Sequence, residues 1–157
     1  MAPSLDEIDV RLLTALQLDA DRPNVELARL VGLSPAATLN RVRRLKESGV
    51  VRSIAARLDS RAAGFPLQLY VLVTLARHDE AATRRFREEL LRLPQVIAAD
   101  DVTGEVDAIL MVVARDVGDL QRVLSRLATR GGTRLLTLLR LEELKPSSPL
   151  PLEPTRT

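Results

Sequence analysis

The stretch from residue 24 to residue 49 constrains the fold most, because residues that start and end helices follow one another there at short spacing. In order they are Asn24, Gly32, Ser34, Pro35 and Gly49. The asparagine and serine suit helix N-caps, the proline suits a first helical position, and each glycine suits the left-handed conformation that ends a helix. The pattern predicts two helices, at 24–31 and 35–48, joined by a very short turn.

Another helix is predicted before these two. Ser4 and Glu7 have the spacing of a capping box, which places a helix start near residue 5. Apolar residues then recur at helical intervals up to about residue 18. After the three helices, Val50 to Leu58 has the composition of a short β ribbon, or wing, with Arg52 and Arg57 on it.

From residue 67 the apolar pattern predicts alternating strands and helices. We expect strands at 67–76, 96–103, 108–114 and 135–144, and helices at 80–93 and 117–129. This βαββαβ order is that of the ferredoxin-like split unit. The predicted fold class is therefore α+β, a winged helix-turn-helix followed by a ferredoxin-like α/β sandwich. The predicted domains are 1–59 for DNA binding, a hinge at 60–66, 67–152 for ligand binding and oligomerisation, and a tail at 153–157. From residue 146 the chain should be extended or partly disordered.

Composition excludes several classes of protein. The 157-residue chain has no cysteine, so it has no disulfide framework and no thiolate metal site, and we expect neither a metal nor a cofactor. Its only aromatic residues are Phe65, Tyr70 and Phe86, which argues against base stacking on single strands. The N-terminus is polar and acidic, and no apolar run reaches the roughly 20 residues of a membrane span. We expect a cytoplasmic protein.

Basic residues concentrate around the predicted helix at 35–48. The chain has a net charge of +2, whereas residues 35–61 hold seven basic and two acidic residues, a net charge of +5. On a helical projection Leu39, Val42 and Leu45 point inward, and the remaining faces are small, polar or basic. The candidate DNA contacts on this helix and the wing are Ser34, Pro35, Ala36, Ala37, Thr38, Asn40, Arg41, Arg43, Arg44, Arg52 and Arg57.

Two interpretations of this basic face are open. Arginines on a surface helix often contact only solvent, as most charge runs do. Asparagine can instead read adenine, arginine can read guanine or hold a phosphate, and the helix N-terminus at Ser34 favours a phosphate. Because a tight glycine turn precedes this helix and a basic ribbon follows it, double-stranded DNA is the favoured partner.

The order and spacing of four segments resemble the Lrp/AsnC family of feast/famine regulators. The segments are Leu5-Asp6-Glu7-Ile8-Asp9, Glu26-Leu27-Ala28, Val31-Gly32-Leu33-Ser34-Pro35 and Arg41-Val42-Arg43-Arg44-Leu45-Lys46-Glu47-Ser48-Gly49-Val50-Val51. The resemblance runs through both predicted domains, to about Leu152. It implies a sequence-specific DNA-binding transcriptional regulator whose second domain oligomerises, as dimers that assemble into octamers, and binds a small effector such as an amino acid.

A turn that carries carboxylates is predicted at Val102–Asp107. Gly104 permits a sharp turn that exposes backbone N–H groups, and Glu105 and Asp107 offer carboxylates. Such donors suit the carboxylate of an α-amino acid, and the acidic side chains suit its ammonium group. The alternative is an ordinary hairpin turn with acidic side chains in solvent. The family resemblance implies an effector pocket at this turn, between subunits, with candidates Thr103, Gly104, Glu105 and Asp107, and with Thr133 and Thr137 as further polar contacts.

The first predicted strand has apolar residues on both faces. Leu69, Val71, Val73 and Leu75 alternate there with Tyr70, Leu72 and Thr74. Helices can cover only one face of a four-stranded sheet of this kind, so a partner sheet is the simplest cover for the other. A two-fold dimer places two recognition helices one turn of DNA apart and predicts a roughly palindromic site.

Two other functions stay open. Relatives with this architecture decarboxylate sirohaem by means of basic and histidine-containing turns. This chain has one histidine, His78, in a loop, and its acidic turn should repel a polycarboxylate, so we predict that it is not an enzyme. The pair Asp100 and Asp101 is as consistent with a strand end as with an acid/base couple. An architectural protein that compacts DNA without a ligand predicts little sequence preference and no response to amino acids.

Overall fold

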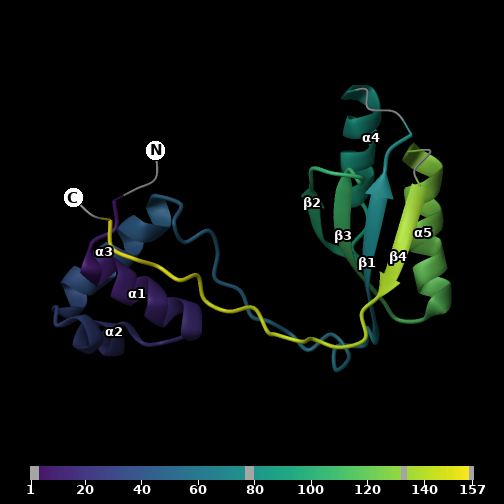
Figure 1. The fold of residues 1–157 in the computed structure, drawn as a ribbon. Helices are drawn as coiled ribbons and strands as arrows, with labels where there is room; N and C mark the ends of the chain where they lie inside the picture. The colour runs from purple at the N-terminus through teal and green to yellow at the C-terminus, as the bar shows by residue number, and fades with distance from the viewer. Residues whose placement is uncertain (1–3, 77–79, 132–133, 156–157) are drawn as a thin grey trace. The chain divides into compact units, whose positions relative to one another are not determined.

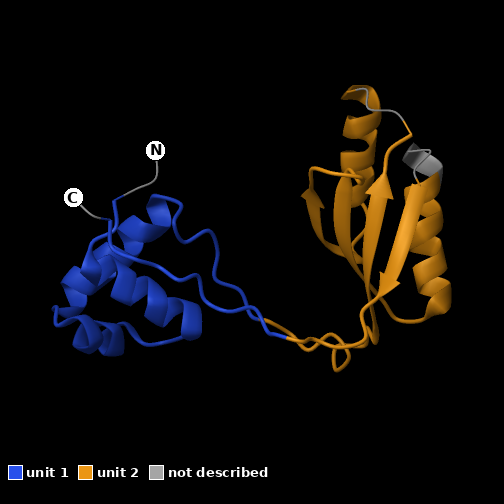
Figure 2. Ribbon diagram, viewed as in Figure 1, with its two compact units in different colours: residues 1–56, 145–157 blue, residues 57–144 orange. Residues whose placement is uncertain are grey.

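A computed structural model describes residues 4–76, 80–131 and 134–155. The chain divides into two compact units, Met1–Ala56 with Lys145–Thr157 as unit 1 and Arg57–Leu144 as unit 2 (Figure 2). Unit 1 contains three helices, and unit 2 contains a four-stranded sheet with two helices (Figure 1). Because the chain returns to the helices after its last strand, unit 1 is built from both ends of the sequence.

The helices of unit 1 are α1 (Glu7–Leu18), α2 (Asn24–Val31) and α3 (Pro35–Glu47). Their inward side chains form a small aliphatic core that includes Leu12, Leu27 and Val42. Gly32 follows α2 in the left-handed conformation, with φ of 72°, and Ser34 is the N-cap of α3. The predicted arrangement of helix, short turn and helix is confirmed.

The predicted start of α1 is wrong. Its N-cap is Asp6, whose Oδ1 accepts the N–H of Asp9 at 2.8 Å, so Ser4 and Glu7 form no capping box. Asp6 and Asp9 form the capping box instead, because the N–H of Asp6 also donates to Oδ2 of Asp9 at 3.5 Å.

Asn24 also differs from its predicted role as a cap. It is the first residue of α2, after the N-cap Pro23. Its Nδ2 donates to the carbonyl oxygen of Pro35 at 2.8 Å. The side chain therefore ties α2 to the start of α3 rather than capping its own helix.

Residues 50–59 form no strand, so the predicted wing is wrong. A strand is stabilised by hydrogen bonds to a neighbouring strand, and within the described residues all paired strands lie in unit 2. Ile54 and Leu58 are exposed rather than packed on a core. The segment that carries Arg52 is therefore irregular.

The C-terminal segment packs against α1. It has no regular secondary structure, as predicted, but the N–H of Thr155 donates to the carbonyl oxygen of Leu5 at 2.9 Å. The N–H of Leu150 donates to Oε1 of Gln17 at 2.6 Å. Leu152 is partly buried. The segment is thus a structural part of unit 1.

Unit 2 has the strands β1 (Leu67–Thr74), β2 (Val96–Asp101), β3 (Ala108–Ala114) and β4 (Arg134–Leu139), and the helices α4 (Glu80–Leu91) and α5 (Val117–Gly131). The strand order is β2-β3-β1-β4 and all neighbours are antiparallel, which confirms the βαββαβ prediction. β4 ends at Leu139, which pairs with Leu69, and a strand that continued to the predicted residue 144 would run past the start of β1 at Leu67 and have no neighbour there.

The two faces of the sheet differ in burial. α4 and α5 cover one face (Figure 1), where Val71 and Leu110 are completely buried against Phe86 of α4 and Val123 of α5. The other face is apolar but open within this chain. Its exposed large residues include Tyr70, Leu136 and Leu138.

Candidate nucleic-acid interface and ligand pocket

The exposed side of α3 is small at its N-terminal end and polar or basic further along. Oγ of Ser34 accepts the N–H of Ala37 at 3.2 Å, which fixes the first turn. The exposed residues are Ser34, Pro35, Ala36, Ala37, Asn40, Arg43 and Arg44. Small side chains let a helix approach base edges, while asparagine and arginine supply the groups that read them. All of these residues were predicted as DNA contacts, and all of them are exposed on unit 1.

Thr38 does not belong to this surface. It is completely buried, and its Oγ1 donates to the carbonyl oxygen of Ser34 at 3.0 Å. Leu39, predicted to point inward, is half exposed. The buried positions of α3 are Thr38, Val42 and Leu45, which are also spaced as one helical face. The hydroxyl can be buried because it donates a hydrogen bond to the preceding turn. Since the side chain is buried, the prediction of Thr38 as a DNA contact is wrong.

Arg41 and Arg44 reach from α3 to two carboxylates of the α1 region. Nη1 of Arg41 donates to Oδ2 of Asp6 at 2.7 Å and to Oδ1 of Asp9 at 2.9 Å. Nη2 of Arg44 donates to Oδ2 of Asp9 at 2.8 Å. The side chains of Asp9, Arg41 and Arg44 are 1%, 27% and 61% exposed. Arg41 therefore links two helices, whereas Arg44 also reaches solvent.

Hydrogen bonds favour the charged forms in this cluster. The N–H of Asp9 lowers the pKa of the Asp6 carboxyl below its ordinary value, and Arg41 lowers it further. Hydrogen bonds to Asp6 and Asp9 raise the pKa of the Arg41 guanidinium. The positive charges of Arg41 and Arg44 are thus balanced by two carboxylates, a feature that helical spacing did not show.

The two predicted wing residues fall in different units. Arg52 is exposed in unit 1, just after α3. Arg57 is exposed in unit 2, where it lines an open groove with Ser60 and Arg140. The structure therefore groups Arg52, but not Arg57, with the residues of α3.

The turn between β2 and β3 has a defined geometry. Thr103, Gly104 and Glu105 are exposed, and Gly104 has a φ of 125°, which favours glycine. Asp107 is half-buried, and its Oδ2 accepts the N–H of Leu75 at 2.7 Å. Asp107 therefore fixes the end of β1 while remaining at the edge of the turn.

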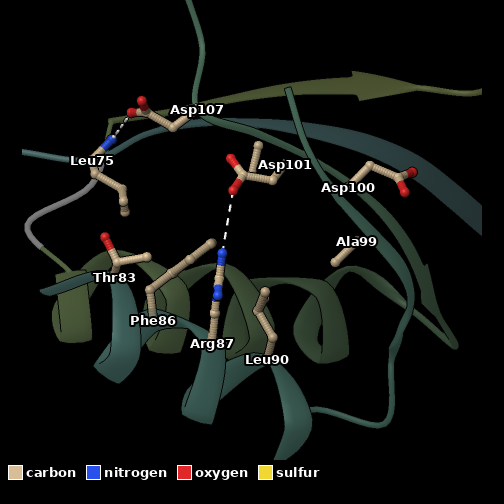
Figure 3. A pocket seen from close by; sticks show the side chains of 10 residues that line it. Leu75, Thr83, Phe86, Arg87, Leu90, Ala99, Asp100, Asp101 and Asp107 are labelled. Atoms are coloured by element: carbon tan, nitrogen blue, oxygen red, sulfur yellow. Dashed lines mark hydrogen bonds and ion pairs between the residues drawn. The ribbon is translucent and has the colours of Figure 1, made fainter. Parts of the chain in front are cut away.

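A cavity of about 250 Å³ lies beside this turn (Figure 3). Its lining residues are Leu75, Thr83, Phe86, Arg87, Leu90, Ala99, Asp100, Asp101, Asp107 and Ala108. Apolar side chains form most of the wall, and acidic groups stand at one side (Figure 3). Nη2 of Arg87 donates to Oδ2 of Asp101 at 3.3 Å. The cavity includes Asp107 but not the three exposed residues of the turn.

The remaining candidates lie elsewhere. Thr137 is half-buried on β4, opposite Val71, and β4 is the edge strand farthest from β2 in the sheet order. Within one chain, Thr137 is thus not brought to the turn. Thr133 and His78 lie outside the described residues.

Sequence reasoning missed the contribution of α4 to the cavity. Phe86 lies on the side of α4 that is buried in the core. Thr83 and Arg87 flank that side, and only the packing of α4 on the sheet shows that they reach the cavity. No local motif marks them.

Two family models match the chain in tandem. The AsnC-type helix-turn-helix domain matches residues 5–46, and the Lrp/AsnC ligand binding domain matches residues 68–150. The chain belongs to the Lrp/AsnC family. It is therefore a DNA-binding transcriptional regulator and not an enzyme, which excludes the decarboxylase alternative.

Curated relatives match nearly the whole chain. It is 39% identical over 153 residues to the HTH-type transcriptional regulator AldR of Mycolicibacterium smegmatis, covering 95% of this chain and 88% of the relative. It is 36% identical over 143 residues to the leucine-responsive regulatory protein of Rhizobium meliloti, covering 90% and 92%. The family assignment thus extends across both units.

Solved structures of similar proteins contain methionine. A transcriptional regulator of Neisseria meningitidis in complex with L-Met is 29% identical, with a TM-score of 0.86 and coverage of 94% of this chain and 97% of that one. A feast or famine regulatory protein of M. tuberculosis complexed with L-methionine is 30% identical, with a TM-score of 0.83 and coverage of 91% and 96%. These likenesses confirm the predicted family and its two-domain fold.

Two kinds of feature are absent from the part of the chain that the structure describes. No helix there combines the length and apolar character needed to cross a membrane. In the same residues, no group of three or more acidic, histidine or cysteine side chains is placed to hold a metal ion.

Proposed function

We propose that this Lrp/AsnC regulator reads double-stranded DNA with the exposed face of α3, supported by Arg52 and Arg57. The observation that carries the proposal is the exposure of Asn40, Arg43 and Arg44 on a helix whose first turn presents only small residues. A helix of this kind fits the major groove. Because the partner is chromosomal DNA, we place the protein in the cytoplasm.

The test uses a duplex enriched from a random-sequence pool by the parent protein, and a scrambled duplex of equal composition. Fluorescence anisotropy should show that Arg44→Ala weakens binding to the selected duplex at least fivefold, since a base contact contributes about 1–3 kcal/mol. Arg92→Ala removes the same charge from an exposed position in unit 2 and should leave both affinities unchanged. If Arg44→Ala binds the selected duplex as tightly as the parent does, the proposal that this face of α3 contacts DNA is rejected.

We infer that the effector is an amino acid with an apolar side chain, bound at the 103–107 turn. The cavity beside the turn has apolar walls from Leu75, Phe86 and Leu90, and its acidic rim suits an ammonium group. Thr103, Gly104 and Glu105 are exposed at the turn, where they can contact the carboxylate of the effector. Thr133 and Thr137 remain candidates for further polar contacts. Methionine in two similar structures supports this chemistry.

Calorimetric titration with L-methionine, L-leucine and L-glutamate tests the effector. We expect heat from the two apolar amino acids and none from glutamate, because the rim is acidic. Asp107→Asn keeps an oxygen for the N–H of Leu75 but removes the charge, so it should abolish the amino-acid effect on DNA binding and spare DNA affinity itself. If the parent responds to none of the three and shows little sequence preference, the architectural alternative replaces the sensor.

We also propose that the open sheet face pairs with the same face of a second chain, and that dimers assemble further into octamers. The support is the exposed apolar group Tyr70, Leu136 and Leu138. Light scattering should give a dimer or octamer mass for the parent and a smaller mass for Leu138→Glu. Leu91→Glu, at an exposed leucine of α4, is the control. A monomeric parent would reject the proposal.

A further inference from the structure

We propose that Asp9 is a positioning residue for DNA recognition, which holds one edge of the Arg44 guanidinium so that its other edge faces the DNA. The inference rests on the proposed role of the α3 face. It assigns a task in sequence discrimination to a carboxylate that is itself buried in unit 1.

The Asp9 carboxylate is fixed from several sides. Oδ1 accepts from Arg41 at 2.9 Å, and Oδ2 accepts from Arg44 at 2.8 Å and from the N–H of Asp6 at 3.5 Å. Arg41 is in turn held by Asp6 at 2.7 Å. A buried carboxylate that is paired on both oxygens has little freedom to turn, so it is a rigid anchor for whatever it holds.

Arg44 uses only part of its hydrogen-bonding capacity on this anchor. A guanidinium has five N–H groups in a planar fork, and the contact to Asp9 uses Nη2. Among the described residues, Nε and Nη1 of Arg44 have no acceptor, and the side chain is 61% exposed. An arginine whose orientation is already fixed loses less conformational freedom when its remaining N–H groups meet a base edge.

Arg43 provides a comparison on the same helix. It is exposed, and no carboxylate pairs with it in the described part of the chain. A long side chain without an anchor suits a phosphate, which accepts contacts from many directions. We therefore assign geometry-dependent base reading to Arg44 and charge-dependent backbone binding to Arg43.

The charge of Asp9 opposes DNA binding in general. Binding to scrambled DNA depends mainly on positive charge, and a carboxylate beside the face reduces it. Binding to the correct sequence also benefits from the orientation that Asp9 imposes on Arg44. The net effect of Asp9 is to increase the ratio between the two affinities.

Asp9→Asn tests this ratio with the selected and scrambled duplexes. We expect the ratio of affinities to fall about tenfold, the size of one lost base contact, with binding to scrambled DNA unchanged or tighter. The control is Asp119→Asn, at a buried aspartate of unit 2, which should leave the ratio at its parental value. An equal loss on both duplexes would mean that Asp9 only maintains the fold, and would overturn the inference.

Lysine substitutions at 44 and 43 give a second test that leaves Asp9 itself in place. A lysine at 44 cannot contact Asp9 and a base with separate edges, so Arg44→Lys should lose most of what Arg44→Ala loses. Arg43→Lys should stay within twofold of the parent. If Arg44→Ala weakens binding but Arg44→Lys binds like the parent, the positioning role is rejected and the α3 face stands. If Arg44→Ala itself binds like the parent, the face is rejected.

Discussion

The two units place their buried carboxylates differently. In unit 1, Asp9 lies between the helical core and the face of α3, and both of its arginine partners come from that helix. In unit 2, Glu89 pairs with Arg126 between α4 and α5, and Asp119 accepts from Gln95 and from Arg122. Neither of these two acids lines the cavity or the open sheet face.

In unit 2 the buried ion pairs are therefore separate from the candidate functional site, whereas in unit 1 they are part of it. The core of unit 2 is larger and mostly aliphatic, with Val71, Leu110, Val112 and Leu127 almost completely buried. The exposed residues of the 103–107 turn lie outside that core. In unit 1 the ion pairs that connect α1 to α3 also set the chemistry of the exposed face. A substitution there should change folding and DNA binding together.

The largest effect should come from the core of unit 2. Leu110 is completely buried on β3, so Leu110→Ala leaves a cavity and should lower the free energy of unfolding by about 2–5 kcal/mol. Urea denaturation followed by circular dichroism measures this loss. Leu139→Ala, at an exposed leucine of β4, should cost less than about 0.5 kcal/mol. Equal effects of the two changes would contradict the assigned core.

Removal of residues 146–157 should affect unit 1 alone. It deletes the hydrogen bonds that Leu150 and Thr155 make with Gln17 and Leu5, and should destabilise α1 by about 1–2 kcal/mol. Hydrogen exchange should become faster in α1 and remain unchanged in β1 and β3. Unchanged exchange in α1 would show that the segment is dispensable.

Two helix caps allow a matched comparison. Ser34 caps α3, and Asp116 accepts the N–H of Asp119 at 2.7 Å at the start of α5. Replacing either residue by alanine should cost about 1 kcal/mol of stability. Only Ser34→Ala should also weaken DNA binding, because the first turn of α3 belongs to the proposed interface. Thermal melting measures the stability of both variants, and fluorescence anisotropy measures their DNA affinity. If the two variants bind DNA equally well, stability and DNA binding are not coupled through the first turn of α3 in unit 1.

The smallest effect should be a loss of stability in acid. The N–H of Arg115 lowers the pKa of the Asp119 carboxyl, and the N–H of Asp9 does the same for Asp6. Because the folded state favours the ionised form, the unfolded state binds more protons below about pH 4. This stabilisation is complete above about pH 4 and disappears as the pH falls through the lower folded pKa. Melting temperatures between pH 3 and 7 should show a weaker acid dependence for Asp119→Asn than for the parent.

The sequence by itself determined the features that depend on near neighbours. Gly32 and Ser34 marked the turn before α3 because caps and left-handed glycines act within one helical turn. The βαββαβ order followed from changes in apolar period, and the family followed from segments that keep their order and spacing.

Tertiary structure decided what depends on distant partners. Thr38 and Leu39 both fit a helical stripe, and only the packing of α1 and α2 selects Thr38 for burial. The wing is absent because a strand needs a neighbour that this chain does not supply within its described residues. Asp9 and Arg44 are 35 residues apart, so no local pattern shows their contact. Local spacing fixes the conformation of a segment, but which of its faces is buried and what its charges contact depends on the segments that pack against it.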